Sequence, residues 1–288
     1  MRPGVALFAI ACIAASFAGC GGGDGQMEET PRPTAAPISA EEVAYVSARD
    51  SRLEIHRVNR FGSGFLNYSA KAGEASSHPS WSPDGNKLAF TSERESSGDV
   101  YVMNPDGSEQ VRITKEEGAD GFPAWSPDGS RIAFVSTRDG NSEIYVMNAD
   151  GSGQTRLTNS GGPDSFPAWS PDGSSIAFES GRSGSLDIYV TNVDGSGQRP
   201  VIVHEAVDFA PAWSPDGKQI AFASNREGHS DIYLASADGS NLVRLLDHLA
   251  EDGDPDWSPD GKRIVFYSDR DGSRDVYVVK TDGTGVTQ

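Results

Sequence analysis

Four aspartates recur at a fixed step and are the residues of this chain best placed to gather charge at one point. Each stands five residues before a tryptophan, and successive members are 44 residues apart. They are Asp120, Asp164, Asp208 and Asp252. Like charges that gather at one place attract a cation, or the lysine or arginine side chain of a partner. We therefore take the four carboxylates, with His78 and Asp254 nearby, as a candidate partner or cation ring.

A structural role competes with this interpretation. Turn aspartates often accept hydrogen bonds from loop backbone, and here they would link adjacent repeats. Repetition favours that role, because a structural device recurs with the fold while a ligand site is commonly asymmetric. Recurring arginines are the simplest partners for the carboxylates. They are Arg49, Arg94, Arg138, Arg182, Arg226 and Arg270.

A weaker candidate is a calcium loop near the end of the chain. Asp269, Asp271 and Asp275 supply carboxylates at alternating positions, and hard oxygen ligands at such spacing can wrap one ion. The bidentate glutamate of a true calcium loop is missing. The five histidines share no metal-ligand spacing. We therefore expect no catalytic residue and no cofactor, with calcium as the exception to test.

The elements that must position these side chains follow from the tryptophan period. Trp81, Trp125, Trp169, Trp213 and Trp257 are 44 residues apart, each within the phrase Pro-x-Trp-Ser-Pro-Asp-Gly. A repeat of this length with several short strands is typical of a β-propeller, an all-β fold in which each repeat forms one blade. Residues just before each phrase should then converge around the mouth of the central channel.

One repeat, residues 122–165, predicts a blade of four antiparallel strands. The expected strands are 122–126, 131–136, 143–148 and 154–158, separated by turns rich in Pro, Asp and Gly. Phenylalanines and tyrosines that keep the same step should fill the space between sheets. They are Phe90, Phe134, Phe178, Phe222 and Phe266, with Tyr101, Tyr145, Tyr189, Tyr233 and Tyr277.

The propeller is expected over residues 41–288. Residues 43–58 repeat the second and third strands of a blade without a recognisable inner strand, and the sequence ends where the last outer strand should begin. Six blades are favoured and five are the alternative, with the first and last blades incomplete.

The first 40 residues predict export and a lipid anchor. Residues 1–19 contain a charged start and an apolar stretch too short to span a bilayer, as in a signal peptide. Small residues before Cys20 are similar to a bacterial lipobox, which would make Cys20 the lipidated residue. Residues 20–40 are rich in Gly and Pro and predict a flexible tether.

The charge of the chain narrows the class of partner. The formal net charge is −18, so the protein repels nucleic-acid phosphates and anionic headgroups. We expect a protein or cell-wall partner with a basic surface, no nucleic acid, and membrane contact only through the anchor.

The phrase Pro-Ala-Trp-Ser-Pro-Asp-Gly-x-x-Ile-Ala-Phe, followed by Ser-x-Arg, Ile-Tyr-Val and Asn-x-Asp-Gly, resembles the repeat of TolB-like (WD-like) propellers. The resemblance covers about residues 43–288. It implies a propeller, but the repeat also occurs in peptidases and sugar lyases. The separate α/β domain of TolB and the Gly-x-Ser-x-Gly turn of peptidases have no counterpart in this sequence.

These observations together favour a non-catalytic, exported and membrane-tethered binding module at the periplasmic or extracellular face of the cell envelope. The alternative is a metal-dependent lyase or hydrolase with its site in the channel. A purely structural envelope protein is the third possibility.

Overall fold

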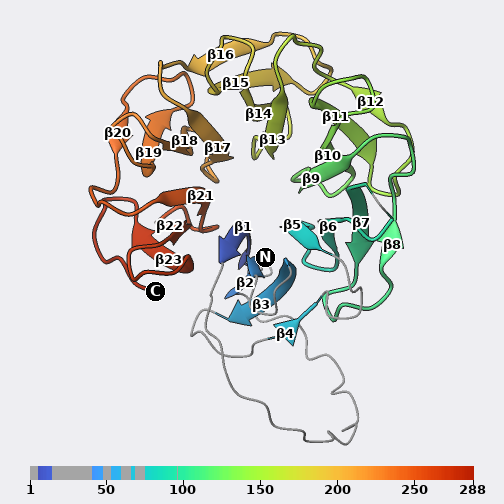
Figure 1. The fold of residues 1–288 in the computed structure, drawn as a ribbon, viewed down its shortest axis with the longest axis horizontal. Coiled ribbons are helices and arrows are strands. Elements are labelled where there is room, and N and C mark those ends of the chain that lie inside the picture. The colour runs from blue at the N-terminus through green and yellow to red at the C-terminus, as the bar shows by residue number, and fades with distance from the viewer. Residues whose placement is uncertain (1–5, 15–40, 48–52, 60–65, 69–74, 96) are drawn as a thin grey trace, which may run out of the picture.

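The computed structural model describes residues 6–14, 41–47, 53–59, 66–68, 75–95 and 97–288. Every regular element in these ranges is a strand, from β1 to β23. The strands form six small sheets arranged around a central axis (Figure 1). Five of the sheets have four strands and one has three. This arrangement confirms the predicted propeller.

The first three sheets run from the blue end of the chain to the green. The first contains β1 (Ala6–Ala14), β2 (Glu41–Ser47), β3 (Glu54–Asn59) and β4 (Leu66–Asn67). The second contains β5 (Ser76–Trp81), β6 (Leu88–Ser92), β7 (Asp99–Met103) and β8 (Val111–Arg112). The third contains β9 (Asp120–Trp125), β10 (Arg131–Ser136), β11 (Glu143–Asn148) and β12 (Thr155–Arg156).

The other three sheets complete the ring. The fourth contains β13 (Asp164–Trp169), β14 (Ser175–Ser180), β15 (Asp187–Asn192) and β16 (Arg199–Ile202). The fifth contains β17 (Asp208–Trp213), β18 (Gln219–Ser224), β19 (Asp231–Ser236) and β20 (Val243–Arg244). The sixth contains β21 (Asp252–Trp257), β22 (Arg263–Ser268) and β23 (Asp275–Lys280).

Five of the six sheets carry the tryptophan phrase, in each case on the innermost strand. These five sheets match the five-blade alternative. The additional first sheet lies between β21–β23 and β5–β8 (Figure 1). We expected this unit to lack an inner strand, but β1 takes that place and pairs in parallel with β2. The physical reason is that a short apolar run suits a buried strand as well as a signal peptide.

Of the first 40 residues, for which a signal peptide and a tether are predicted, the structure describes only 6–14. Strand β1 lies inside the segment predicted as a signal peptide. Cys20 and the tether of residues 20–40 lie outside the described residues and remain sequence predictions. Within the described ranges, no helix has the length and the hydropathy that crossing a membrane requires.

The predicted strands of one repeat match the third sheet closely. The expected second and third strands coincide with β10 and β11, which pair antiparallel from Arg131↔Asn148 to Ser136↔Glu143. The inner strand β9 begins two residues earlier than expected, and the outer strand β12 is shorter. The last blade has three strands, and an isolated bridge between Thr287 and Val278 lies where a fourth strand would pair with β23.

The repeated aromatic residues form the core between sheets. All five phenylalanines are fully buried, and each ring lies 5.6–6.1 Å from the tyrosine ring of the next strand. Four of the tyrosines are buried and Tyr189 is half-buried. Large flat side chains at these positions remove much apolar surface from water.

Candidate functional site

Each inner strand of the tryptophan blades carries a β-bulge at the same position. In β9, Phe122 and Pro123 together face one residue of β10, and the register shifts there. The first residue of each bulge has a positive φ of 46–53°, which is costly for a residue other than glycine. The five are His78, Phe122, Phe166, Ala210 and Asp254. Because a bulge re-aims side chains, these five residues turn toward the axis.

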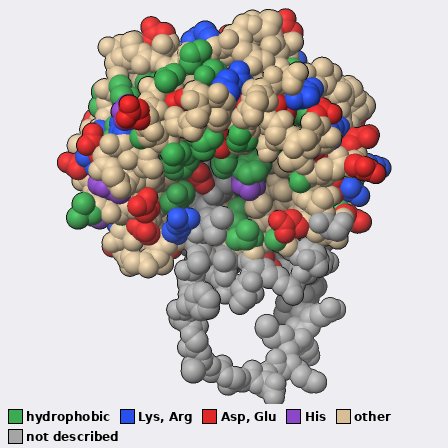
Figure 2. Space-filling model, turned by 45° about the horizontal axis from the view of Figure 1, so that its top comes forward, with side chains coloured by type: hydrophobic (Ala, Val, Ile, Leu, Met, Phe, Trp, Pro, Cys, Tyr) green, Lys and Arg blue, Asp and Glu red, His purple; other side chains and the backbone are tan. Residues whose placement is uncertain are grey.

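The bulges surround a cavity of about 320 Å³ in the channel. All five bulge residues line it, together with prolines and tryptophans of the repeated phrase. We call this space the channel cavity. Figure 2 shows a hollow in one face of the molecule, with hydrophobic side chains around it and histidine and acidic side chains near its centre. Ligand sites are usually concave and mostly apolar, with a few polar groups.

One wall of the channel cavity is aromatic. The rings of His78 and Phe122 lie 3.8 Å apart between centroids, and those of Phe122 and Phe166 lie 4.6 Å apart. Burial lowers the pKa of His78 to about 4, so its imidazole is neutral near pH 7. The Nδ1 atom of His78 lies 2.8 Å from the Ser77 hydroxyl oxygen. This wall therefore presents ring faces without positive charge.

An acidic pair lies elsewhere in the channel. Burial, together with the neighbouring negative charge of Glu179, raises the pKa of Asp254 to about 7. Glu179 is only 5% exposed, and burial also raises its pKa. Its carboxylate accepts hydrogen bonds from the Ser165 hydroxyl at 2.7 Å and from the Ala210 backbone N–H at 3.2 Å. Asp254, by contrast, receives no hydrogen bond and no ion pair from the described residues.

The four aspartates of the candidate ring lie at the start of inner strands. Their side chains have no exposed surface, and each forms an ion pair with the arginine of its own blade. The shortest N–O distances are 3.0 Å for Arg138–Asp120, 2.8 Å for Arg182–Asp164 and Arg226–Asp208, and 3.1 Å for Arg270–Asp252. In the fifth equivalent blade, Ser76 replaces the aspartate. The arginine partners proposed from the sequence are therefore found for four blades.

Each arginine also stacks against the core. The Arg182 guanidinium carbon lies 4.6 Å from the centre of the Tyr189 ring, and its Nε donates to Ser180. The corresponding guanidiniums of four other blades lie 4.3–4.9 Å from their tyrosines. Cation–π contacts and charge-assisted hydrogen bonds together fix the side chain. Arg49 lies outside the described residues.

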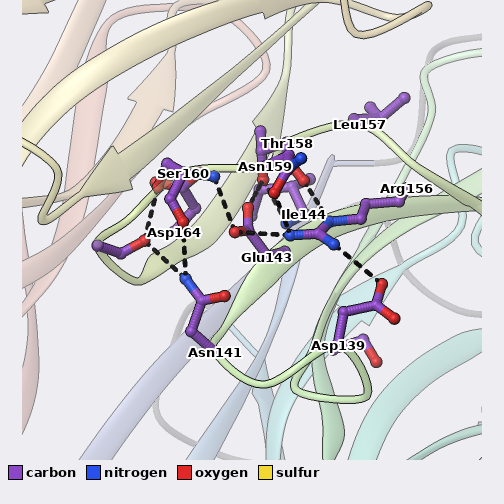
Figure 3. Close-up of polar contacts among 12 residues, drawn as sticks. Asp139, Asn141, Glu143, Ile144, Arg156, Leu157, Thr158, Asn159, Ser160 and Asp164 are labelled. Carbon is purple, nitrogen blue, oxygen red and sulfur yellow. Dashed lines mark hydrogen bonds and ion pairs between the residues drawn. The ribbon is translucent and has the colours of Figure 1, made fainter.

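Polar contacts continue from one blade to the next (Figure 3). Arg156 donates to Glu143 at 3.0 Å, and Glu143 accepts the backbone N–H of Ser160 at 2.9 Å. The Ser160 hydroxyl in turn donates to Asp164 of the following blade at 3.3 Å. Asn141 donates to the backbone carbonyls of Ser160 and of Gly162. This network ties the loop between β12 and β13 to both sheets.

The calcium candidates face different groups. Asp271 accepts a hydrogen bond from the Tyr277 hydroxyl, Asp275 accepts one from Ser273 at 2.7 Å, and Asp269 accepts the Glu251 N–H at 2.9 Å. In the part of the chain that the structure describes, no group of three or more His, Cys, Asp or Glu side chains gathers in a way that could hold a metal ion.

Sequence reasoning named His78 and Asp254 as candidates but did not name Glu179, Phe122 or Phe166. A signal for them was present. The residue before the proline of each tryptophan phrase takes four identities in five repeats, while the rest of the phrase barely changes. Glu179 likewise places a carboxylate in an apolar strand. A variable position in an otherwise regular repeat indicates where the blades could carry different functional side chains.

Comparisons with known proteins agree with this architecture. A family model described as the TolB beta propeller domain matches residues 30–142, 116–208 and 196–288. A search among curated protein sequences gives no significant match.

Several solved structures are similar to this chain. A protein assigned provisionally as TolB, from Agrobacterium tumefaciens, is 29% identical with a TM-score of 0.68 over 74% of this chain and 80% of that chain. TolB from Acinetobacter baumannii is 24% identical with a TM-score of 0.77, over 85% of this chain and 62% of its own length. An oligogalacturonate lyase in complex with manganese is 18% identical with a TM-score of 0.59, over 82% and 76%. The last two similarities show the fold alone.

Proposed function

The chain belongs to the TolB β-propeller domain family, and from this premise we propose that it is a non-catalytic binding module for a protein or cell-envelope partner. In this proposal the protein is exported and held at the envelope by a lipid on Cys20. The channel cavity is the contact site. The family match and the similarity to the Agrobacterium tumefaciens protein support this proposal, because both point to the same propeller family.

One observation carries the proposal. The blades repeat closely, yet the five bulge residues that face the channel cavity differ in size, charge and aromaticity. Each of them holds a backbone conformation that costs about 1 kcal/mol or more. A merely structural device would repeat with the fold, whereas an asymmetric lining is typical of a site that recognises one ligand.

Capture of partners from envelope extract tests this function. The full chain is immobilised beside a Phe122→Ala/Phe166→Ala variant, which removes the aromatic wall. A matched control is Val243→Ala on the outer strand β20, where the side chain is 57% exposed. We expect a partner held by the parent and the control and lost by the cavity variant. Equal capture by all three would contradict a role for the channel cavity.

The four ring aspartates need a separate test, because their carboxylates already pair with arginines. Asp164→Asn and Asp208→Asn should each lower the free energy of unfolding by about 3 kcal/mol, since each leaves a guanidinium without its counter-charge. Urea unfolding measures this loss, with Asp247→Asn as the control because that side chain is 87% exposed. If still-folded variants lose the partner as well, the ring contributes to recognition. Unchanged capture would limit the ring to holding the blades.

The competing function is a metal-dependent lyase or hydrolase with its site in the channel. It is favoured by the fact that His78 and Asp254 line one cavity, with the charge of Glu179 acting on Asp254. Metal analysis of protein purified without added ions separates the two functions. A metal at one equivalent that is lost on Asp254→Asn substitution would favour the enzyme, and partner capture without bound metal would favour the binding module.

A further inference from the structure

The carboxylate of Asp254 stands apart from the buried acids of this propeller. Asp252, two residues earlier, pairs with Arg270, and Asp231 pairs with Arg244 at 2.7 Å. Asp254 lines the channel cavity without a hydrogen bond or an ion pair from the described residues. A carboxylate in surroundings of low polarity is costly when it is ionised without a partner. The Asp254 carboxylate therefore has no positively charged group bonded to it among the described residues.

Among the described residues, the charged groups that act on Asp254 are of both signs. Glu179 of β14 adds a second negative charge, and Arg274 is the resident cation that acts on Asp254. The Arg274 guanidinium lies 4.9 Å from the centre of the Tyr267 ring, so it is engaged in a stacking contact. His78 and Asp256 also line the cavity, and His78 is neutral near pH 7. When Asp254 and Glu179 are both ionised, their two negative charges outnumber the single positive charge of Arg274 that acts on Asp254.

The aromatic wall selects for the type of cation. The rings of His78, Phe122 and Phe166 lie within 3.8–5.9 Å of one another between centroids. The negative face of an aromatic ring attracts organic cations, and more so when they are desolvated. A divalent metal would instead need several oxygen or nitrogen ligands at close range. The cavity thus combines ring faces with a carboxylate that has no partner in the described part of the chain.

Resting on the function proposed above, we infer that the channel cavity receives a single ammonium or guanidinium group, a lysine or arginine side chain that the partner inserts against Asp254. Glu179 strengthens the field behind that carboxylate. The rings of Phe122 and Phe166 pack along the apolar stem of the inserted side chain, as long basic side chains permit. The formal net charge of −18 attracts such a partner from a distance.

Short capped peptides test the inference without the natural partner. The probes are acetyl-Gly-Arg-Gly-amide and acetyl-Gly-Lys-Gly-amide, with acetyl-Gly-citrulline-Gly-amide as the uncharged analogue of the first. Binding to the full chain is followed by tryptophan fluorescence at about pH 8, where Asp254 is mostly ionised. Trp125, Trp169 and Trp213 line the cavity and report its occupation. Comparison of the arginine peptide with the lysine peptide shows whether the cavity prefers a guanidinium or an ammonium group.

We expect the charged peptides to bind about tenfold or more tightly than the citrulline peptide, and Asp254→Asn to abolish this preference. Glu205→Gln is the matched control, because it removes one charge from an exposed residue outside the cavity and should leave the preference unchanged. Binding of the charged peptides should also weaken as the pH falls below about 7, since Asp254 then takes up a proton.

Three results would overturn the inference. They are equal binding of the arginine and citrulline peptides, no binding at millimolar peptide, and an Asp254→Asn variant that keeps the preference. Calcium or manganese ions that bind the parent more tightly than the peptides and fail to bind Asp254→Asn would assign the cavity to a metal instead. If an envelope partner is lost with Phe122→Ala/Phe166→Ala and retained by Asp254→Asn, the binding module stands and the cation pocket fails.

Discussion

Two aspartates only two residues apart, Asp252 and Asp254, have opposite surroundings. Asp252 is fully buried and forms an ion pair with Arg270, so its charge is compensated within the blade. Asp254 is half-buried, lines the channel cavity and has no such partner among the described residues. The difference comes from the bulge, which rotates the strand between them. In this one strand, an aspartate therefore supports the fold at position 252 and faces the channel cavity at position 254.

Asp254→Asn should stabilise the protein at alkaline pH. The folded-state pKa of about 7 lies above the ordinary value near 4, so the folded protein favours the protonated acid. The stability that protonation contributes is present below about pH 4 and is lost as the pH rises to about 7. At about 1.4 kcal/mol per pKa unit the upper bound is about 4 kcal/mol, and partial exposure reduces it.

Urea unfolding of both proteins at about pH 8 and about pH 4 measures this effect. The free energy of unfolding of the variant should exceed that of the parent by one to a few kcal/mol at the higher pH and match it at the lower. A variant that is less stable than the parent at about pH 8 would show that the carboxylate has a partner in solution. A more stable variant would mean that Asp254 lowers the stability of the parent protein in return for a binding site.

The blade is the element that sets where these side chains lie. Its second and third strands form an unbroken antiparallel ladder, as from Ser175↔Asn192 to Ser180↔Asp187. The inner strand pairs with the second strand on both sides of the bulge and not within it, and register shifts there in all five tryptophan blades. The rigid ladder therefore holds a bulge at a fixed depth in the channel. Each blade contributes one re-aimed residue to the cavity.

Gly253→Ala should test how closely one bulge is packed. A Cβ atom at Gly253 would lie 2.5 Å from the Tyr267 ring of the neighbouring strand, which forces either group to move. Overpacking of this kind costs about 1–3 kcal/mol. Tyr267→Val should recover part of the loss, because the equivalent residue of the third blade is Val135.

A double-mutant cycle by urea unfolding measures the coupling between Gly253 and Tyr267. Gly140→Ala is the control, since nothing lies within 4 Å of a Cβ at that position, although its φ of +111° adds strain that is unrelated to Tyr267. The loss at Gly140 should not change when Tyr267 is replaced. Additive effects of Gly253→Ala and Tyr267→Val would contradict the packing described here.

At the scale of the whole molecule, six sheets surround one channel, and the acidic charge is spread over the ring. The net charge of −18 cannot be neutralised by the ion pairs that hold the blades, because each such pair uses one charge of either sign. A ring of this kind concentrates negative potential toward its concave centre. The field acts on any basic partner before contact, whereas the channel cavity acts only after docking.

Association with the captured partner should therefore slow as salt is added. Between low ionic strength and about 1 M salt the Debye length falls to about 3 Å, so long-range attraction is screened. The association rate constant should fall by about tenfold or more while the dissociation rate changes less. Surface plasmon resonance on the immobilised full chain measures both rates. An association rate that is independent of salt would show that the acidic surface plays no part in partner encounter.

The propeller, the strands of each blade and the aromatic core could be predicted from the sequence, because a 44-residue period and turn chemistry are local signals. It also indicated the arginines that pair with Asp120, Asp164, Asp208 and Asp252. The three-dimensional fold was needed to show that these aspartates are enclosed in their own blades, whereas His78, Phe122, Phe166 and Asp254 share a cavity. The reason is that a bulge and a closed ring bring together residues more than a hundred positions apart, and no local pattern encodes the direction in which each side chain points.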